Sequence, residues 1–257
     1  MCDDSLDPTP LAGGVTRREF TVMGATVALA GCAGHGASAP GGDLVERTVT
    51  IPTAGGMADA FYVHPAQGTH PGVICWPDIA GLRDAFKAMA RRLAGEGHAV
   101  LVVNQYYRNA PAPVLQTFAE WRTPEGQARL KPMIAAITPQ GTMADAAAFV
   151  RFLDGDDAVD KRRGISAHGY CMGGPFTVLT AAAAPERVRA AASFHGARLV
   201  TDAADSPHRL LARTQASYLF AISQDDAAKA RGDKDALRAA ATAAGRPAEV
   251  EVYLANH

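Results

Sequence analysis

The first clear pattern in the chain is an alternation of hydrophobic and polar residues. Residues 45–51 read Val-Glu-Arg-Thr-Val-Thr-Ile, which is typical of a β-strand with one buried face. Residues 59–64 follow a Gly-Gly turn and predict the partner strand of a hairpin. Residues 72–76 and 98–104 differ, because their apolar residues are nearly continuous. Such runs indicate strands that are buried on both faces of a sheet.

Helical periodicity alternates with strand patterns along the rest of the chain. Residues 82–94 repeat large apolar residues every three or four positions, which predicts an amphipathic helix. Residues 105–140 contain several prolines and little periodicity, so we expect an irregular excursion over the sheet. The alternation predicts an α/β fold in a single domain, with a mostly parallel central sheet flanked by helices. The other predicted strands are 164–168, 188–194, 218–222 and 248–254, and the other predicted helices are 143–153, 172–184 and 233–244.

Residues 1–39 have the pattern of an export signal. Arg17 and Arg18 precede about ten uncharged, mostly apolar residues, and small residues follow. The arginine pair resembles a twin-arginine signal, and Leu-Ala-Gly-Cys at 29–32 resembles a lipobox, which is cleaved and lipidated on its cysteine, here Cys32. We therefore expect an exported protein that is periplasmic or anchored to a membrane through this lipid.

Two alternatives remain open for the same segment. Ala-Ser-Ala at 37–39 is a competing cleavage site. The segment is also compatible with an alanine-rich tail that does not direct export. In each case a glycine-rich linker leads into a folded domain that we expect to span residues 40–257.

The composition excludes several classes of protein. Of the 257 residues, 48% are hydrophobic and 20% are charged, which is ordinary for a globular protein and argues against a disordered one. The net charge of −1 argues against a nucleic-acid partner, because such proteins usually carry a basic surplus. These numbers leave a small molecule as the expected partner, and they carry no prediction of the oligomeric state.

Two of the four cysteines, Cys75 and Cys171, lie in the expected domain. Neither belongs to a CxxC pair or to a Cys/His spacing that binds metal, so the sequence predicts no metal site. We also predict that the two cysteines do not form a disulfide. Cys75 lies three residues before Asp78, which we expect level with Cys171, and three strand residues span about 10 Å. A disulfide needs Cα atoms within about 7 Å.

The hexapeptide Gly-Tyr-Cys-Met-Gly-Gly at 169–174 joins a predicted strand to a predicted helix. Its G-x-C-x-G spacing is that of a nucleophile elbow, in which glycines two before and two after the nucleophile permit a very tight turn. The turn would place the Cys171 thiol above a helix N-terminus, where a thiolate is stabilised. The backbone N–H of Met172 would then face a developing oxyanion. The alternative is a glycine-rich turn around a structural cysteine.

A thiol nucleophile needs a base, and the base needs an acidic residue to orient it. In elbow-containing sheets the order along the chain is nucleophile, acid, histidine. Asp225 and Asp226 follow the predicted strand 218–222, and His257 follows the predicted strand 248–254. We favour Asp225 over Asp226, because a residue nearer to the strand end is held more firmly. The remaining histidines are interpreted as ordinary core or surface residues, namely His35, His64, His70, His98, His168, His195 and His208.

With Cys171, Asp225 and His257 in place, the chain resembles the dienelactone hydrolase family from about residue 45 to its end. The resemblance implies an α/β-hydrolase fold with a Cys-Asp-His triad. It also implies hydrolysis of a lactone or ester that bears a carboxylate, without metal or organic cofactor. The motifs that carry it are Pro-Asp-Ile-Ala-Gly at 77–81, Arg-Arg-Leu-Ala-Gly-Glu-Gly at 91–97, Tyr-Tyr-Arg at 106–108, the hexapeptide at 169–174 and Glu-Val-Glu-Val-Tyr at 249–253.

The resemblance assigns roles to three further residues. Ile79 matches the position of the second backbone N–H of the oxyanion hole. Asp78 matches a glutamate that contacts and activates the thiol, although aspartate is one methylene shorter. Arg108 matches an arginine that binds the carboxylate of the substrate. The simpler alternatives are a loop or helix-capping carboxylate for Asp78 and a solvated arginine for Arg108.

Family members continue for one more helix after the histidine, whereas His257 is the last residue of this sequence. We therefore interpret the sequence as truncated at its C-terminus. Two other functions compete with a hydrolase. One is a non-catalytic binding lipoprotein on the same scaffold, and the other is a redox protein in which Cys171 is oxidised and Cys75 resolves it.

Overall fold

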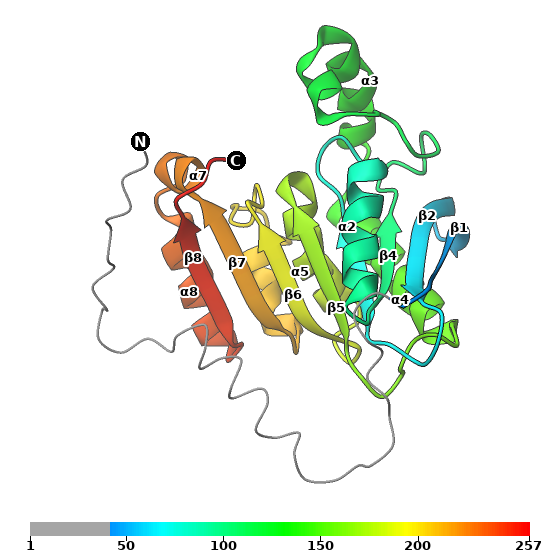
Figure 1. Cartoon of the computed structure of the whole chain (residues 1–257). Helices are drawn as coiled ribbons and strands as arrows, with labels where there is room; N and C mark the ends of the chain where they lie inside the picture. The colour runs from blue at the N-terminus through cyan, green and yellow to red at the C-terminus, as the bar shows by residue number, and fades with distance from the viewer. Residues whose placement is uncertain (1–41) are drawn as a thin grey trace, which may run out of the picture. The chain divides into compact units, whose positions relative to one another are not determined.

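The computed structural model describes residues 42–257, which form one eight-stranded sheet with helices on both faces (Figure 1). The strand order across the sheet is β1-β2-β4-β3-β5-β6-β7-β8. The expected fold class, a mostly parallel sheet flanked by helices, is confirmed. The strands are β1 (Leu44–Thr53), β2 (Gly56–Pro65), β3 (Gly72–Trp76), β4 (Ala99–Val103), β5 (Ile165–Tyr170), β6 (Val188–Phe194), β7 (Ser217–Ser223) and β8 (Ala248–Tyr253).

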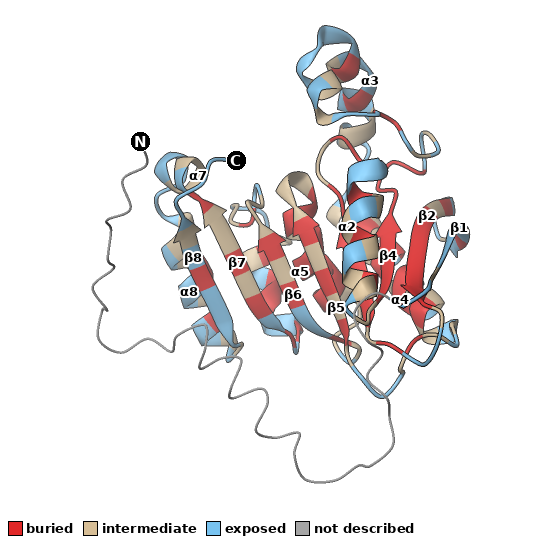
Figure 2. Ribbon diagram, in the orientation of Figure 1, coloured by how far each residue is buried: buried red, intermediate tan, exposed pale blue. Residues whose placement is uncertain are grey.

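The two patterns of hydrophobicity separate the edge of the sheet from its centre. β1 and β2 form the expected antiparallel hairpin, and β2 is also antiparallel to β4. All other neighbouring strands are parallel. Every residue of β3 and β4 is buried, as their continuous apolar runs predict. In Figure 2, β4 is red along its length.

Helices pack on both sides of the sheet and enclose two layers of core. On one side, α2 (Asp84–Gly95) packs over β2 and β4 and covers Phe61, Val73 and Cys75. On the other side lie α4 (Pro139–Gly155), α5 (Gly174–Ala183) and α8 (Asp233–Ala244) (Figure 1). This second layer contains the large buried side chains of Trp76, Phe149 and Phe220.

The segment 105–140 is more ordered than the sequence predicts. It contains a 3₁₀ turn, η1 (Phe118–Arg122), the helix α3 (Pro124–Ala135) and the first turn of α4. Two of its prolines occupy the first helical position, after Thr123 and Thr138, whose hydroxyls accept the N–H groups of Gly126 and Gly141. Proline is favoured there, so these residues start helices rather than break them. The capping threonines were the signal that the sequence analysis overlooked.

A second unexpected helix, α7 (Gln224–Lys229), begins directly after β7. Ser223 caps it by accepting the backbone N–H of Asp226 at 3.3 Å. The sequence analysis places Asp225 and Asp226 after the strand and predicts no helix there. The remaining short elements are η2 (Cys171–Gly173), α6 (Pro207–Leu210) and η3 (Leu211–Arg213).

The carboxyl ends of the parallel strands meet at one edge of the sheet, which is where ligands bind in folds of this type. The ends of β3, β5, β6 and β7 lie there, and so does the chain end that follows β8 (Figure 1). None of the helices within residues 42–257 is long and apolar enough to cross a membrane.

Candidate active site

Cys171 lies in the sharp turn between β5 and α5. Its φ of 51° is in the left-handed region, which is strained for a residue with a side chain. A Cβ on Gly169 would fall on the backbone carbonyl of Gly173, so a side chain at this position would not fit. The close approach of residues two before and two after the cysteine, as the sequence predicts, is therefore present in the structure.

The elbow also packs against the end of β3. A Cβ on Gly173 would overlap the backbone carbonyls of Trp76 and Pro77. This contact brings the turn after β3 beside the thiol, and the backbone N–H groups of Ile79 and Met172 both hydrogen-bond to Cys171. The two amides that the sequence analysis assigns to an oxyanion hole therefore converge on the same sulfur.

The environment of the thiol favours its protonated form. Burial raises the pKa of Cys171, and the negative charges of Asp78 and Asp226 act in the same direction. Hydrogen bonds from the Met172 and Ile79 amides oppose this rise but do not cancel it. For this sulfur to act as a nucleophile, a base would have to take its proton.

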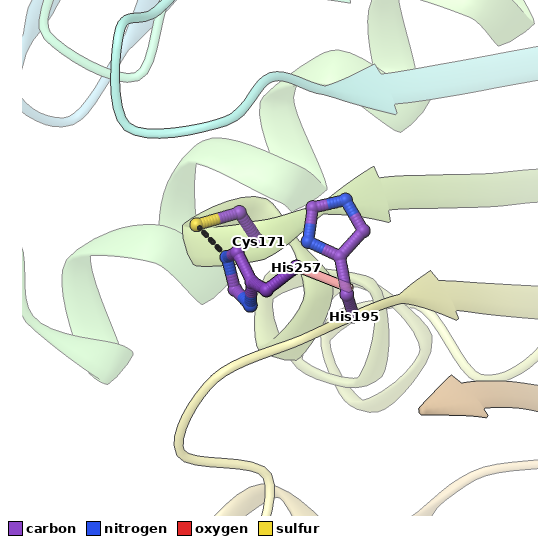
Figure 3. A group of neighbouring side chains, drawn as sticks. All are labelled: Cys171, His195 and His257. Carbon is purple, nitrogen blue, oxygen red and sulfur yellow. Dashed lines mark hydrogen bonds between the residues drawn. The ribbon is translucent and has the colours of Figure 1, made fainter. Parts of the chain in front are cut away.

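His257 is in position to be that base. Its Nε2 lies 3.1 Å from Cys171 Sγ (Figure 3), and its Nδ1 lies 2.6 Å from Asp226 Oδ2. Because Nδ1 faces a carboxylate, the tautomer with the proton on Nδ1 leaves Nε2 free to accept the thiol proton. The His257 side chain is 26% exposed, so solvent still reaches this side of the site.

The acidic partner of the histidine ring is Asp226, so the preference for Asp225 is wrong. The preference rested on the position of Asp225 nearer to the end of β7, and it did not take a helix at this place into account. However, α7 begins there, and Asp226 is its third residue. The Asp226 carboxylate accepts a hydrogen bond at 2.7 Å from the hydroxyl of Ser223, the residue that caps the helix. Burial would raise the pKa of Asp226, but hydrogen bonds from His257 and Ser223 outweigh it and hold the pKa below its ordinary value.

Asp225 holds the backbone of the histidine rather than its ring. Its Oδ1 accepts the backbone N–H of His257 at 2.9 Å, and its Oδ2 accepts Lys229 Nζ at 3.0 Å. The hydrogen bond from Lys229 is the largest of the effects that hold the pKa of Asp225 well below its usual range. Both aspartates therefore hold His257: Asp225 holds its backbone, and Asp226 holds its ring.

The resemblance implies a contact between Asp78 and the thiol, but the hydrogen bonds of the Asp78 carboxylate go to other residues. Its carboxylate binds both terminal nitrogens of Arg83, at 2.7 and 2.8 Å, and accepts the backbone N–H of Ala80 at 2.9 Å. The short aspartate side chain forms a local turn with the residue two positions on. Its charge raises the pKa of the Cys171 thiol, and this opposes activation.

Arg108, which the resemblance expects to bind the carboxylate of the substrate, pairs with a carboxylate of the protein itself. Its two terminal nitrogens bind the carboxylate of Asp145 on α4, at 2.7 and 2.9 Å, and its guanidinium stacks on Tyr107 at 4.6 Å. The Asp145 side chain is only 6% exposed, so it requires this partner. Within residues 42–257, no contact links Arg108 to Cys171 or His257.

Two residues that the sequence analysis missed hold the turn after β3 that carries the Ile79 amide. The buried Gln105 donates its amide to the carbonyl of Asp78 at 2.7 Å, and this carbonyl belongs to the peptide unit that contains the Ile79 N–H. The Tyr106 hydroxyl donates to the carbonyl of Ile79 at 2.7 Å. Donation to the Asp78 carbonyl orients the Ile79 N–H and strengthens it as a donor, whereas the Tyr106 hydroxyl holds the next peptide unit of the same turn. Their position directly after β4, at the carboxyl edge, was the available signal.

His195 is a further unexpected member of the site. It follows β6, and its ring lies 4.4 Å from the ring of His257, edge to face (Figure 3). Desolvation by burial lowers the pKa of His195, and the adjacent His257 acts in the same direction. The sequence analysis set this histidine aside because it precedes the acidic residue along the chain, although a strand-end position brings it to the same edge.

Cys75 is far less accessible than Cys171. It is 1% exposed beneath α2, burial raises its pKa, and both cysteines are free thiols. In the β3–β5 pairing Cys75 lies opposite His168, three residues before Cys171, so the predicted offset between the two cysteines is confirmed. An enclosed thiol is poorly placed to resolve an oxidised Cys171. The export signal and Cys32 fall outside the described residues.

Comparison with known proteins gives sequence relatives of modest identity. A protein of Salmonella typhi named "Putative carboxymethylenebutenolidase" is 27% identical over 224 residues, covering 83% of this chain and 77% of its own. A protein with the same name from Methylorubrum extorquens is also 27% identical, covering 82% of this chain and 70% of its own.

Solved structures share the fold. A crystal structure of a "Putative Dienelactone Hydrolase" from Klebsiella pneumoniae superposes with a TM-score of 0.67 at 23% identity, covering 82% of this chain and 85% of its own. An acetyl xylan esterase from a Paenibacillus species superposes with a TM-score of 0.58 at 17% identity, covering 84% of this chain and 79% of its own. At these identities the likeness concerns the fold.

The family itself is settled by a direct match. The sequence profile described as "Dienelactone hydrolase family" matches residues 58–257, which is the whole sheet apart from its first strand and the start of its second. The match confirms the resemblance read from the motifs, and with the named relatives it confirms the expectation of a hydrolase acting on ester bonds. The chain belongs to the dienelactone hydrolase family.

Proposed function

We propose that the protein hydrolyses a small carboxylic ester or lactone through an acyl-enzyme on Cys171. The observation that carries the proposal is the chain of contacts from Cys171 Sγ to His257 Nε2, at 3.1 Å, and from His257 Nδ1 to Asp226, at 2.6 Å. A nucleophile hydrogen-bonded to a base that is itself oriented by a third group is the arrangement that nucleophilic catalysis needs.

Each group in this chain has a defined step. As Sγ attacks the carbonyl carbon, its proton passes to His257 Nε2, and the charged imidazolium is stabilised by Asp226. The carbonyl oxygen becomes negative and accepts the Met172 and Ile79 amides, which already point at the sulfur. When the intermediate collapses, the C–O bond breaks and the leaving oxygen takes the proton from His257. A water molecule, deprotonated by His257, then hydrolyses the thioester and restores the thiol.

The groups around the thiol also bear on the substrate class. Arg83 and Lys229 neutralise Asp78 and Asp225, Arg108 is itself paired with Asp145, and Asp226 adds a negative charge beside His257. We therefore propose that a carboxylate on the substrate is not required, in contrast to what the resemblance to the family implies. Neutral esters should be hydrolysed at least as well as esters of the same size that bear a carboxylate.

A panel of p-nitrophenyl and alkyl esters, each in a neutral and a carboxylate-bearing form, tests both parts. The native protein should turn over the neutral esters, and Cys171→Ala should lower kcat by about 10⁴-fold or more, as loss of a triad nucleophile does. Cys75→Ala is the matched control, because it removes the other described thiol and should retain turnover. An active Cys171→Ala protein would disprove the mechanism. A strong preference for the charged esters would disprove the proposal on substrate class alone.

We further propose that residues 1–39 direct export and that Cys32 carries a lipid. The support is the sequence pattern of paired arginines, an apolar stretch and a lipobox-like tetrapeptide. Cell fractionation of the full chain, with Cys32→Ala and a double Arg17→Lys, Arg18→Lys variant, tests it. Release of the Cys32→Ala protein from the membrane fraction and cytoplasmic retention of the double variant are expected. An unchanged distribution of both variants would contradict the proposal.

A further inference from the structure

Three potential metal ligands converge at the thiol. Cys171, His195 and His257 each offer one sulfur or nitrogen atom, and these three atoms all lie within 4.8 Å of one another (Figure 3). They come from the ends of β5, β6 and the segment after β8, so the fold, and not one local motif, brings them together. Hydrolysis as proposed above uses Cys171 and His257 and assigns no step to His195.

His195 has a nitrogen that the protein leaves unsatisfied. Its Nδ1 is buried and has no hydrogen-bond partner within the described residues. The residue holds a φ of 41°, in the left-handed region, and its backbone N–H is fixed by the Ala221 carbonyl at 2.7 Å. A buried polar atom without a partner is costly, and strain at a site is often associated with function. In Figure 3 the His195 ring lies beside that of His257, on the side of the thiol.

The second histidine already has the support that a metal ligand requires. Histidine ligands usually donate their other ring N–H to a carboxylate, which fixes the tautomer and orientation of the ring. His257 meets this condition through Nδ1 and Asp226, and Asp226 is in turn held by the Ser223 hydroxyl. Nε2 is therefore presented toward the sulfur whether a proton or a metal is bound there.

The donor set selects a particular class of cation. One thiolate and two imidazoles suit zinc and similar borderline-soft ions, whereas calcium and magnesium require oxygen ligands. Zinc–ligand bonds of about 2.0–2.3 Å place ligand atoms of one ion about 3–4 Å apart. The 3.1 Å separation of Cys171 Sγ and His257 Nε2 already fits this range, so a small movement of His195 completes the set.

We propose that Cys171, His195 and His257 form a zinc-binding site with a fourth position open to solvent, and that zinc bound there blocks hydrolysis. On binding, the thiol loses its proton to solvent and forms a Zn–S bond, while Nε2 of His257 and Nδ1 of His195 supply electron pairs. The ion then occupies the sulfur and the base together, so acyl transfer and zinc binding exclude each other. Metal binding itself does not depend on the proposed function, whereas the inhibition does.

The test is a titration of the metal-free full chain with Co²⁺ and Zn²⁺. Tetrahedral Co²⁺ with a thiolate ligand gives visible d–d bands and a near-ultraviolet sulfur-to-metal band, and Zn²⁺ should displace both. The affinity for Zn²⁺ is measured against a chromogenic chelator and should fall at least tenfold in His195→Asn. Loss of an outer-sphere partner lowers metal affinity by about 10–100-fold, and loss of a ligand should cost at least as much. Asparagine tolerates the left-handed backbone, and His195→Phe, which keeps a ring against His257, is the second variant.

His208→Asn is the matched control, because His208 is partly exposed, binds Ser206 and does not belong to the cluster. It should bind Zn²⁺ as the native protein does. The absence of a sulfur-to-metal band, or equal Zn²⁺ affinity in the native, His195→Asn and His195→Phe proteins, would overturn the proposal. Ester turnover without added metal is measured in parallel, so loss of the zinc site and failure of the hydrolase mechanism give separate results.

Discussion

The two halves of the active site are built in different ways. The elbow around Cys171 is held by backbone packing: Gly169 lies against Gly173, and Gly173 against the carbonyls that end β3. The half that holds His257 is exposed, and side chains fix it, with Asp225 on the backbone and Asp226 on the ring. Steric fit of the backbone determines the geometry of the elbow. The position of His257 depends instead on which carboxylate contacts its backbone and which contacts its ring.

The two halves therefore differ in how far their atoms can move. A side chain in the elbow would collide with backbone atoms, so the position of the sulfur is fixed by the fold. His257 is held by hydrogen bonds among partly exposed groups, which exchange with water more easily. We infer that changes in the elbow alter both folding and catalysis, whereas changes in the second half alter catalysis with little effect on folding.

Among variants that leave the nucleophile in place, we expect the largest effect in the second half. Asp226→Asn removes the charge that orients His257 and stabilises its protonated form, so kcat should fall by about 10³–10⁴-fold, as it does when the acid of a triad becomes an amide. Asp225→Asn is the matched control, with an expected loss below about tenfold. Ester hydrolysis by both variants checks this, and equal losses, or a greater loss in Asp225→Asn, would show that the acid is misassigned.

Gly173→Ala tests the elbow half. The new methyl group would overlap the carbonyls of Trp76 and Pro77, so the free energy of unfolding should fall by about 3 kcal/mol and turnover should fall with it. Gly95→Ala, at the end of α2, is the control, because no atom lies within 4 Å of its added Cβ. Urea unfolding measures both. A Gly173→Ala protein as stable as Gly95→Ala would mean that the elbow is not held by this contact.

Protonation of His168 should make the free energy of unfolding depend on pH in the half of the protein that carries the elbow. It lies in β5, and burial lowers its pKa to about 4, while the nearby His98 acts in the same direction. An unfolded histidine has a pKa of about 6.5, so between these values the unfolded state binds the extra proton. Stability is therefore complete above about pH 6.5 and falls by up to about 3 kcal/mol as the pH drops to 4.

The check is urea unfolding of the native and His168→Leu proteins between pH 4 and pH 7. The variant should lose this part of the acid sensitivity, because leucine cannot take up a proton. Turnover at neutral pH, where both proteins are folded, serves as the control for the geometry of the site. Parallel pH dependences in the two proteins would exclude His168 as the source.

The smallest predicted effect concerns the junction of the elbow with the oxyanion hole. Gln105→Leu removes the donor to the Asp78 carbonyl and should lower kcat about tenfold with little change in KM, since the hydrogen bond acts on the transition state through the Ile79 amide. The exposed Gln140, which binds Asp205, supplies the control variant Gln140→Leu. An unchanged kcat in Gln105→Leu would show that the Ile79 amide needs no support.

The same division explains which features could be predicted from the sequence. The glycine spacing around Cys171 has a steric cause, so it predicts the turn directly, and the continuous apolar runs predict the buried strands β3 and β4. The choice between Asp225 and Asp226 depends on whether a helix or a loop follows β7. Ser223 followed three residues later by Asp226 was a capping signal, and it would have supported the correct choice.

Arg108 and Asp78 show a second limit. The resemblance assigns them roles toward the substrate and the thiol, but each is paired within the protein, with Asp145 and Arg83. Asp145 lies 37 positions from Arg108 along the chain, and no periodicity relates the two. Pairings across such distances depend on how α4 packs beside the loop after β4, which local patterns do not encode.

The central claim is that Cys171 forms a covalent acyl intermediate. The most direct measurement mixes the native protein with p-nitrophenyl acetate, stops the reaction with acid and maps the acetylated peptide by mass spectrometry. The account predicts a burst of about one p-nitrophenolate per protein and one acetyl group on Cys171, bound as a thioester that neutral hydroxylamine removes. Steady turnover without a burst, or unchanged turnover after Cys171 has been alkylated with iodoacetamide, would contradict it.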